Sequence, residues 1–236
     1  YESAVAFGKF QNMLADYPAE TLHETIRDFH DTKKRLQNLK TAIEKDVCHR
    51  AGEVRREIDF ALAHEALANV FGDLLERGEV PLRVTHNDTK LNNVMMDVET
   101  GKGICVVDLD TVMPGLAMND FGDSIRFGAS TALEDEKDLS KVSCDMGLYE
   151  AYVKGFLESC GDKLTKKEIE LLPMGAMVMT YECGIRFLSD YLEGDHYYKI
   201  EREEQNLDRC RTQFKLVADM EQKWDIMQEI LHRYQK

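Results

Sequence analysis

Turn-forming residues are scarce in this chain, which holds 15 glycines and 4 prolines among its 236 residues. A sandwich or barrel of many short strands needs frequent turns, and Gly and Pro are the residues that turns use most. The scarcity therefore favours long helices over a many-stranded sheet. Apolar spacing agrees between residues 60 and 75, where a single helix face carries Phe60, Ala63, Leu67, Phe71 and Leu74.

Similar periodicity predicts helices over most of the remaining chain. They cover residues 21–42 as one or two helices, then 120–128, 148–158, 166–192 with a break at Pro173, and 201–236. Three short β-prone runs lie between them at 82–85, 94–96 and 104–107, and a polar turn joins the last two into a hairpin. The sequence thus predicts an α+β, predominantly helical fold that is helical over 1–80, carries a loop and hairpin over 81–115, and is helical again over 116–236.

The composition disfavours several classes of partner. With 30 basic against 44 acidic residues the formal net charge is −14, which repels nucleic acids and anionic membrane surfaces. No apolar stretch of the sequence approaches the roughly 20 residues of a membrane span. The six cysteines form no CxxC pair, which is typical of reduced thiols, so we expect a cytoplasmic protein.

The most distinctive polar segment is His86–Asn93, which lies between two apolar, β-prone runs. The third β-prone run, 104–107, is followed directly by Asp108. The pattern H-x-D-x-x-x-x-N followed by a strand-borne Asp matches the catalytic loop and metal ligand of kinases. A fixed carboxylate such as Asp88 can take the proton of a substrate hydroxyl. Asn93 and Asp108 offer the hard oxygen ligands that Mg²⁺ prefers, beside the phosphates of ATP.

Two sequence blocks here, T-H-N-D-T-K-L-N-N-V and V-V-D-L-D-T-V-M-P-G, resemble the aminoglycoside phosphotransferase and choline kinase-like superfamily. Within it they look most like the N-acetylhexosamine 1-kinase group. The resemblance implies the C-terminal lobe of a protein kinase-like fold, with ATP as co-substrate and Mg²⁺ as cofactor. It makes Asp88 the catalytic base, Asn93 and Asp108 the metal ligands, and Asp110 an auxiliary metal or water contact.

Two departures from the commonest family pattern, H-G-D-x-H-x-x-N, narrow the choice within the superfamily. Asn87 stands in place of Gly, and Lys90 stands in place of the second His. Both departures resemble those of the hexosamine kinase group, and they weaken an assignment to the aminoglycoside kinases. Lys90 is then expected to act beside Asp88, in contact with the γ-phosphate.

Two further residues are expected to support the loop. His86 is interpreted as a packed, hydrogen-bonded residue that orients the loop. For Asp120, the resemblance implies a carboxylate that orders the loop from behind. Its place at the start of a helical pattern fits a simple helix N-cap equally well.

Glu182, Arg186 and Asp190 recur every four residues on an otherwise apolar helix. Buried polar side chains need partners, so these three either form an internal ion-pair ladder or line a substrate site. The resemblance supports the second reading, because hexosamine kinases hold the sugar with a comparable Arg. Arg186 is then the first substrate-binding candidate, followed by Tyr197 and Asp190. The ring of Tyr197, or of its neighbour Tyr198, can stack on the sugar or hydrogen-bond it.

A kinase of this kind also needs a nucleotide-binding lobe, with a flexible loop over the phosphates and a lysine on a strand. The chain has no GxGxxG, no Walker A motif and no β-rich segment before residue 80. We therefore expect residues 1–236 to form the catalytic and substrate-binding lobe without the N-terminal lobe. Such a fragment would fold but would not turn over.

The expected reaction is phosphoryl transfer from ATP to a hydroxyl of a small molecule, with the anomeric hydroxyl of a sugar or N-acetylhexosamine as the leading acceptor. One alternative is a choline, homoserine or aminoglycoside kinase on the same scaffold, and choline would call for an aromatic cage. Another is a non-catalytic relative that binds a ligand. The sequence leaves the acceptor and the oligomeric state open.

Overall fold

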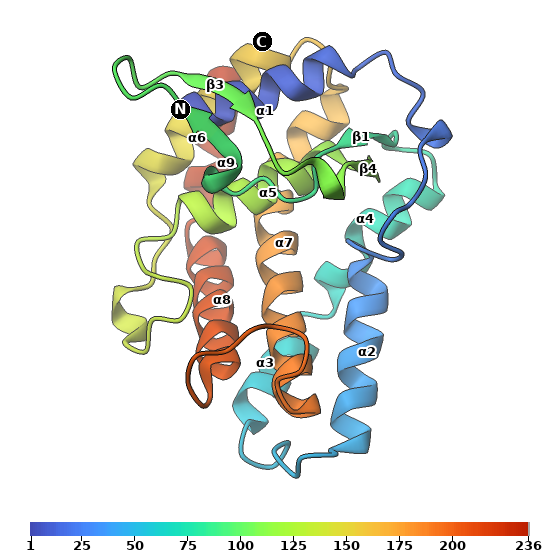
Figure 1. Cartoon of the computed structure of the whole chain (residues 1–236), viewed down its shortest axis with the longest axis vertical. Coiled ribbons are helices and arrows are strands. Elements are labelled where there is room, and N and C mark those ends of the chain that lie inside the picture. The colour runs from blue at the N-terminus through green and yellow to red at the C-terminus, as the bar shows by residue number, and fades with distance from the viewer. Residues whose placement is uncertain (236) are drawn as a thin grey trace.

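The computed structural model describes residues 1–235 and is predominantly helical, as the sequence predicts (Figure 1). The helices are α1 (Glu2–Met13), α2 (Thr32–Lys45), α3 (Arg55–Ala63), α4 (Ala66–Glu76), α5 (Ala117–Gly128), α6 (Met146–Cys160), α7 (Lys166–Glu193), α8 (Gln205–Gln222) and α9 (Trp224–Tyr234). Short 3-10 turns lie at Ala19–Thr21, Leu91–Asn93, Leu109–Thr111 and Leu139–Lys141. Within residues 1–235, no helix is both long and apolar enough to cross a bilayer.

Four short strands form two separate antiparallel pairs. The predicted hairpin is confirmed, because β2 (Val94–Met96) pairs with β3 (Gly103–Val106). The other pair joins β1 (Arg83–Thr85) to β4 (Met113–Gly115), which the sequence does not predict because Pro-Gly reads as a turn. A two-stranded sheet has only edge strands, where a proline need not donate a hydrogen bond.

Pro173 does not break the helix that the sequence interrupts there. α7 runs continuously from Lys166 to Glu193 with Pro173 inside it, so the predicted break is wrong. A proline costs a helix one backbone hydrogen bond, here the bond to the carbonyl of Ile169. α7 packs against α5, α8 and α2, and this burial keeps the helix intact.

Three other predicted helices have different bounds. The helix over 60–75 is interrupted between α3 and α4, and the helix over 201–236 is interrupted between α8 and α9. The helix over 21–42 starts only at Thr32, because Asp31 caps it by accepting the backbone N–H of Lys34 at 2.9 Å. Residues 22–31, which precede this cap, form an irregular segment that we call the strap.

α7 is the central element and passes through both hydrophobic cores. In Figure 1, α5 lies across one end of α7, while α2 and α8 flank its other half. The first core is built mainly from α5, α6, α9 and the first half of α7, with Phe121, Tyr149, Phe156 and Leu172 among its buried residues. The second core joins α2, α3 and α8 to the second half of α7, through Leu39, Ile58, Ile185 and Leu188.

The contact between α5 and α7 is a backbone-to-backbone contact made possible by two glycines. A Cβ atom on Gly122 would lie 2.1 Å from the carbonyl oxygen of Gly175. A Cβ atom on Gly175 would lie 2.2 Å from the carbonyl oxygen of Met118. The two helices can therefore approach this closely only because both side chains are absent.

We expect Gly175→Ala to lower the free energy of unfolding by about 1–3 kcal/mol, because the added methyl group overlaps with backbone atoms that cannot move aside. Urea unfolding followed by circular dichroism measures the change. Gly72→Ala in α4 is the matched control, since nothing lies within 4 Å of its Cβ position. There the same change should be neutral or should stabilise by about 0.5–1 kcal/mol. Equal stability of Gly175→Ala and the parent protein would contradict the close approach.

Candidate active site

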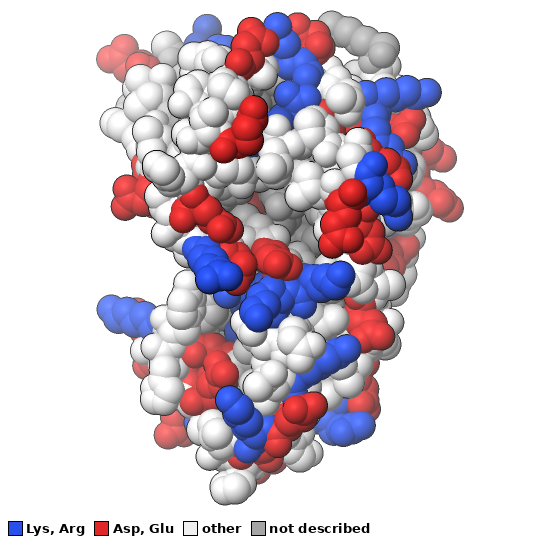
Figure 2. Space-filling view, turned by 90° about the vertical axis from the view of Figure 1, so that its right-hand side faces the viewer, with Lys and Arg blue, Asp and Glu red and all other residues white. Residues whose placement is uncertain are grey.

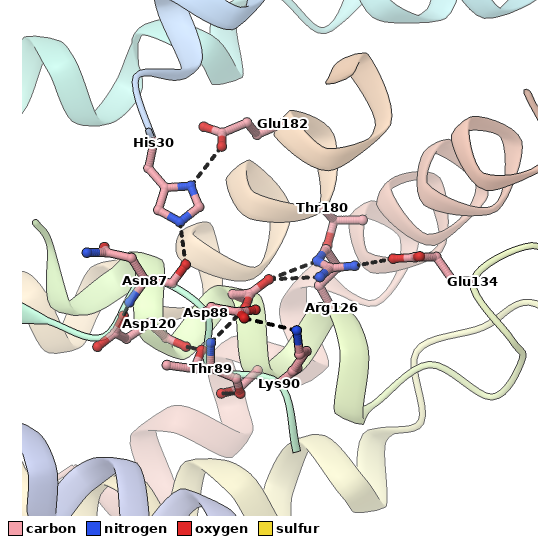
Figure 3. A network of polar contacts seen from close by, with 12 residues as sticks. His30, Asn87, Asp88, Thr89, Lys90, Asp120, Arg126, Glu134, Thr180 and Glu182 are labelled. Atoms are coloured by element: carbon pink, nitrogen blue, oxygen red, sulfur yellow. Dashed lines mark hydrogen bonds and ion pairs between the residues drawn. The ribbon is translucent and has the colours of Figure 1, made fainter. Parts of the chain in front are cut away.

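The loop His86–Asn93 connects β1 to β2, and one buried carboxylate holds its first two residues. The side chain of Asp120 accepts the backbone N–H of His86 at 2.9 Å and the side-chain amide of Gln11 at 2.6 Å. It also accepts the backbone N–H of Asn87 at 2.8 Å, and Figure 3 shows these two residues side by side. The N-cap alternative is wrong, because Leu116 occupies the N-cap of α5. Asp120 lies one turn further along and faces the loop from behind.

The next turn of α5 holds the loop as well. Asp123 accepts the backbone N–H of Thr89 at 2.9 Å, and the hydroxyl of Ser124 donates to the carbonyl of Thr89 at 2.7 Å. Sequence reasoning did not find either residue. The only signal was spacing, because Asp123 follows Asp120 by three residues and so lies on the same helix face.

His86 is fully buried and bridges the loop to the hairpin. Its Nε2–H donates to the carbonyl of Val107 at 2.9 Å, and its Nδ1 accepts the backbone N–H of Asp88 at 3.3 Å. The rings of Phe7 and Phe10 pack edge-on against the imidazole. The histidine is thus a hydrogen-bonded core residue that touches the backbone of Asp88.

Asp88 has two partners within the loop. Its carboxylate accepts from the Lys90 ammonium at 2.9 Å and from the Asn93 side-chain amide at 3.0 Å. The same amide group donates to the Asp88 carbonyl at 2.8 Å. Because the nitrogen of Asn93 is occupied in this way, its side-chain oxygen faces away from Asp88 and is available as a ligand.

Asp108 lies beside Asn93 because the backbone N–H of Val107 donates to the carbonyl of Asn93 at 2.9 Å. Asp108 adopts a left-handed backbone conformation with φ 62°, and it is exposed. Within residues 1–235 neither Asp108 nor Asp110 has a hydrogen-bonded carboxylate, and no cluster of three or more His, Cys, Asp or Glu side chains is arranged to hold a metal. An amide oxygen and one or two free carboxylates nevertheless suit Mg²⁺, which takes its remaining ligands from phosphate and water.

Asp88 and Lys90 open into a cavity of about 380 Å³ that α7 and the following loop close on the far side. Arg186, Tyr197 and its alternative Tyr198 also line this cavity, so the structure brings the predicted base together with Arg186 and both candidate tyrosines. On the molecular face shown in Figure 2, acidic and basic side chains are interspersed and no extended field of one sign forms.

The ion-pair ladder considered for α7 is wrong, because each of its three members faces different groups. Glu182 accepts from Thr32 at 2.6 Å and contacts His30 at 2.8 Å. Arg186 makes no hydrogen bond or ion pair with any of residues 1–235. Its guanidinium carbon lies 5.7 Å from the ring centres of both Phe29 and Tyr198, within cation–π range.

Asp190 holds the loop that follows α7. Its carboxylate accepts the backbone N–H groups of His196, Tyr197 and Tyr198 at 2.9, 2.8 and 3.0 Å. The side-chain amide of Asn206 donates to it at 2.8 Å. With four donors around it, Asp190 shapes the loop that carries the tyrosines, and this geometry does not support the predicted direct contact with substrate.

Arg126 is a cavity residue that the sequence did not single out. Its guanidinium pairs with Asp123 at 2.9 Å and with Glu134 at 2.8 Å. Figure 3 shows the pair with Glu134. Since Asp123 also holds the backbone of Thr89, Arg126 connects the loop to the cavity wall. Its charge is neutralised by these two acids, which leaves Arg186 as the cavity arginine without an acidic partner among residues 1–235.

A model of the phosphotransferase enzyme family, APH, matches residues 4–152. The chain belongs to this family. The matched segment contains the loop, Asp108 and Asp120 and stops before α7. Membership in the family supports a kinase-type enzyme and implies ATP, a divalent metal and a small-molecule substrate.

We expect Asp120→Asn to loosen the loop. In the parent each Asp120 oxygen accepts a backbone N–H, whereas in the variant one of these N–H groups would face the amide nitrogen, which cannot accept. The free energy of unfolding should fall by about 1–3 kcal/mol, and the amides of His86 and Asn87 should exchange faster with deuterium. Asp110→Asn is the matched control, since its exposed carboxylate has no hydrogen bond to the described chain. It should stay within about 0.5 kcal/mol of the parent. Unchanged exchange at His86 and Asn87 in Asp120→Asn would contradict this role.

Proposed function

We propose that this chain is the catalytic lobe of a kinase that transfers the γ-phosphoryl group of ATP to a hydroxyl of an uncharged sugar. The leading acceptor is the anomeric hydroxyl of an N-acetylhexosamine. One observation carries the proposal: Asp88 and the unpaired Arg186 line the same cavity of about 380 Å³. A cavity of this size suits a single sugar ring.

Each residue of the loop has a distinct part in the proposed reaction. Asp88 aligns the acceptor hydroxyl and takes its proton as the new bond to phosphorus forms. Lys90, 2.9 Å from Asp88, offsets the negative charge that develops on the transferred group. Asn93 and Asp108 would hold Mg²⁺, which neutralises phosphate charge when it is bound. Asp120 and His86 keep the loop in shape.

The aromatic residues of the cavity argue against choline as the acceptor. A quaternary ammonium would need free aromatic faces. Here Arg186 already lies within 5.7 to 6.0 Å of the ring centres of Phe29, Tyr197 and Tyr198. The guanidinium repels a second cation and offers hydrogen-bond donors to hydroxyl and carbonyl oxygens. Polycationic aminoglycosides are disfavoured for the same reason.

We also propose that a nucleotide-binding lobe from outside these residues completes the site. Between α1 and β3 lies an open groove of about 670 Å³, lined by Met13, Ile104 and Leu109. Their exposed fractions are 76, 62 and 55%, which is high for large apolar side chains. The groove borders β3, and Asp108 follows that strand by two residues, so a lobe seated there would bring its nucleotide to the proposed metal ligands.

The test is phosphorylation by the complete gene product with Mg·ATP, offered N-acetylglucosamine, N-acetylgalactosamine, choline, homoserine and an aminoglycoside in parallel. We expect turnover with a hexosamine and a fall of at least about 10³-fold in kcat for Asp88→Asn, which removes the proton acceptor but keeps the side-chain shape. Asp97→Asn, in the exposed turn of the hairpin, is the control and should retain full activity. Full turnover by Asp88→Asn would refute the mechanism.

Arg186→Met should raise the KM for the sugar by about tenfold or more, which corresponds to ~1.4 kcal/mol of lost binding, while kcat changes little. Methionine keeps much of the side-chain length and removes the donors. Initial rates over a range of sugar concentrations separate the two constants. An unchanged KM would remove Arg186 from the acceptor site, and a preference for choline in the parent enzyme would overturn the sugar assignment.

A further inference from the structure

His30 lies in the strap and reaches the catalytic loop from outside it. Its Nδ1 is 2.8 Å from Oε1 of Glu182 on α7, and its Nε2 is 2.9 Å from the carbonyl oxygen of Asn87 (Figure 3). The imidazole thus connects three segments that are distant in sequence: the strap, α7 and the loop. Only 10% of the His30 side chain is exposed, so water does not replace these contacts.

Both neighbours of the ring are hydrogen-bond acceptors. A backbone carbonyl can only accept, and a carboxylate does the same when it is ionised. A neutral imidazole carries one N–H and would leave one of the two contacts without a proton, with two lone pairs facing each other. The imidazolium form carries an N–H on each nitrogen and satisfies both contacts.

Glu182 needs this positive charge. Its side chain is 1% exposed, and its second oxygen accepts the hydroxyl of Thr32 at 2.6 Å. Arg186, one turn further along α7, forms no ion pair with it. A buried carboxylate without a counter-charge is strongly unfavourable, so His30 is the group that compensates Glu182.

The carbonyl that His30 contacts belongs to the peptide group joining Asn87 to Asp88. The N–H of the same peptide group donates to Nδ1 of His86 at 3.3 Å. This peptide is therefore held by a histidine at each end. It also follows directly on Asn87, whose left-handed backbone conformation has φ 65°. Its orientation decides the direction in which the Asp88 side chain leaves the backbone.

We propose that His30, as an imidazolium, is a positioning residue that fixes the Asn87–Asp88 peptide and so aims the Asp88 carboxylate into the cavity. We call the two contacts of His30, with Glu182 and with the Asn87 carbonyl, the clamp. The clamp is a property of the fold, and its catalytic consequence rests on the proposed function of Asp88. The strap is not helical before Thr32 because this irregular path places His30 against the loop.

The electrostatics agree with the contacts. Burial alone would lower the pKa of His30, but the charge of Glu182 and the hydrogen bonds to Glu182 and Asn87 raise it above its ordinary value. Asp123 of α5 adds to this attraction, whereas Arg186 of α7 stands near Glu182 with the opposite sign. Burial likewise would raise the pKa of Glu182, and His30 lowers it.

The sign of the pH dependence follows from the raised pKa. The clamp contributes its full stability below the unfolded-state pKa of about 6.5, and it loses this contribution as pH rises through the higher pKa of the folded state. Alkaline pH should therefore loosen the strap and the Asp88 amide while the helices stay folded.

The experiment is an NMR titration of the histidine rings combined with hydrogen exchange of the Asp88 amide, on the parent chain, His30→Gln and Glu182→Gln. In the parent chain we expect the His30 ring to titrate above about 6.5 and the Asp88 amide to lose protection in the same pH range. In His30→Gln the Asp88 amide should exchange about tenfold faster at pH 6, and its protection should no longer change with pH in the range where His30 titrates. In Glu182→Gln the His30 titration should move to lower pH.

His64→Gln is the matched control. His64 contacts the carbonyl of Phe60 and the carboxylate of Glu221, the same two kinds of group, but it lies far from the loop. Its substitution should leave the Asp88 amide unchanged. A His30 ring that titrates at or below about 6.5 in the parent chain, or unchanged Asp88 exchange in a folded His30→Gln, would overturn the clamp.

Steady-state kinetics test the positioning role of His30 independently. In the complete enzyme, kcat should fall in His30→Gln with little change in KM for the sugar, and the parent kcat should decline as His30 deprotonates. A raised KM for the sugar with an unchanged kcat would place His30 in acceptor binding and overturn the positioning role. Absence of phosphorylation with every acceptor, together with the expected titration and exchange, would overturn the proposed function and still support the clamp.

Discussion

The arrangement of this site depends on one buried carboxylate. Asp120 is 1% exposed and accepts two consecutive backbone N–H groups of the loop His86–Asn93 together with the side-chain amide of Gln11. The loop takes its shape from α5, and α5 in turn is placed by the glycine contact between Gly122 and Gly175. Because α7 carries Arg186, this single helix crossing sets the distance between Asp88 and Arg186 across the cavity.

The polar residues of α7 illustrate how one helix face can serve several purposes. Glu182 holds the strap through His30, Arg186 stays unpaired in the cavity, and Asp190 folds the loop that carries Tyr197. A ladder of ion pairs would have used the same three residues to neutralise one another. Instead, the neighbouring segments satisfy the two acids, and the cation is left available to a ligand.

Local sequence predicted the hairpin and the helical character, because each depends on residues close together in the chain. The roles of Asp123, Arg126 and His30 could not be predicted in the same way. His30 meets Glu182 across 152 positions, and no local pattern encodes that contact. The strand after Val112 was missed because Pro-Gly has a stronger local preference for turns than for an edge strand. The Pro173 break was wrong because burial of α7 outweighs one lost hydrogen bond.

Paramagnetic broadening by Mn²⁺, with and without ATP, most directly tests whether the loop held by Asp120 forms a site for metal-assisted phosphoryl transfer. The side-chain amide of Asn93 and the backbone amides of Val107 and Asp108 should broaden first, and Asp108→Asn should abolish the effect. Sharp signals from these groups, with broadening centred on another acidic surface of the chain, would contradict the placement of the active site.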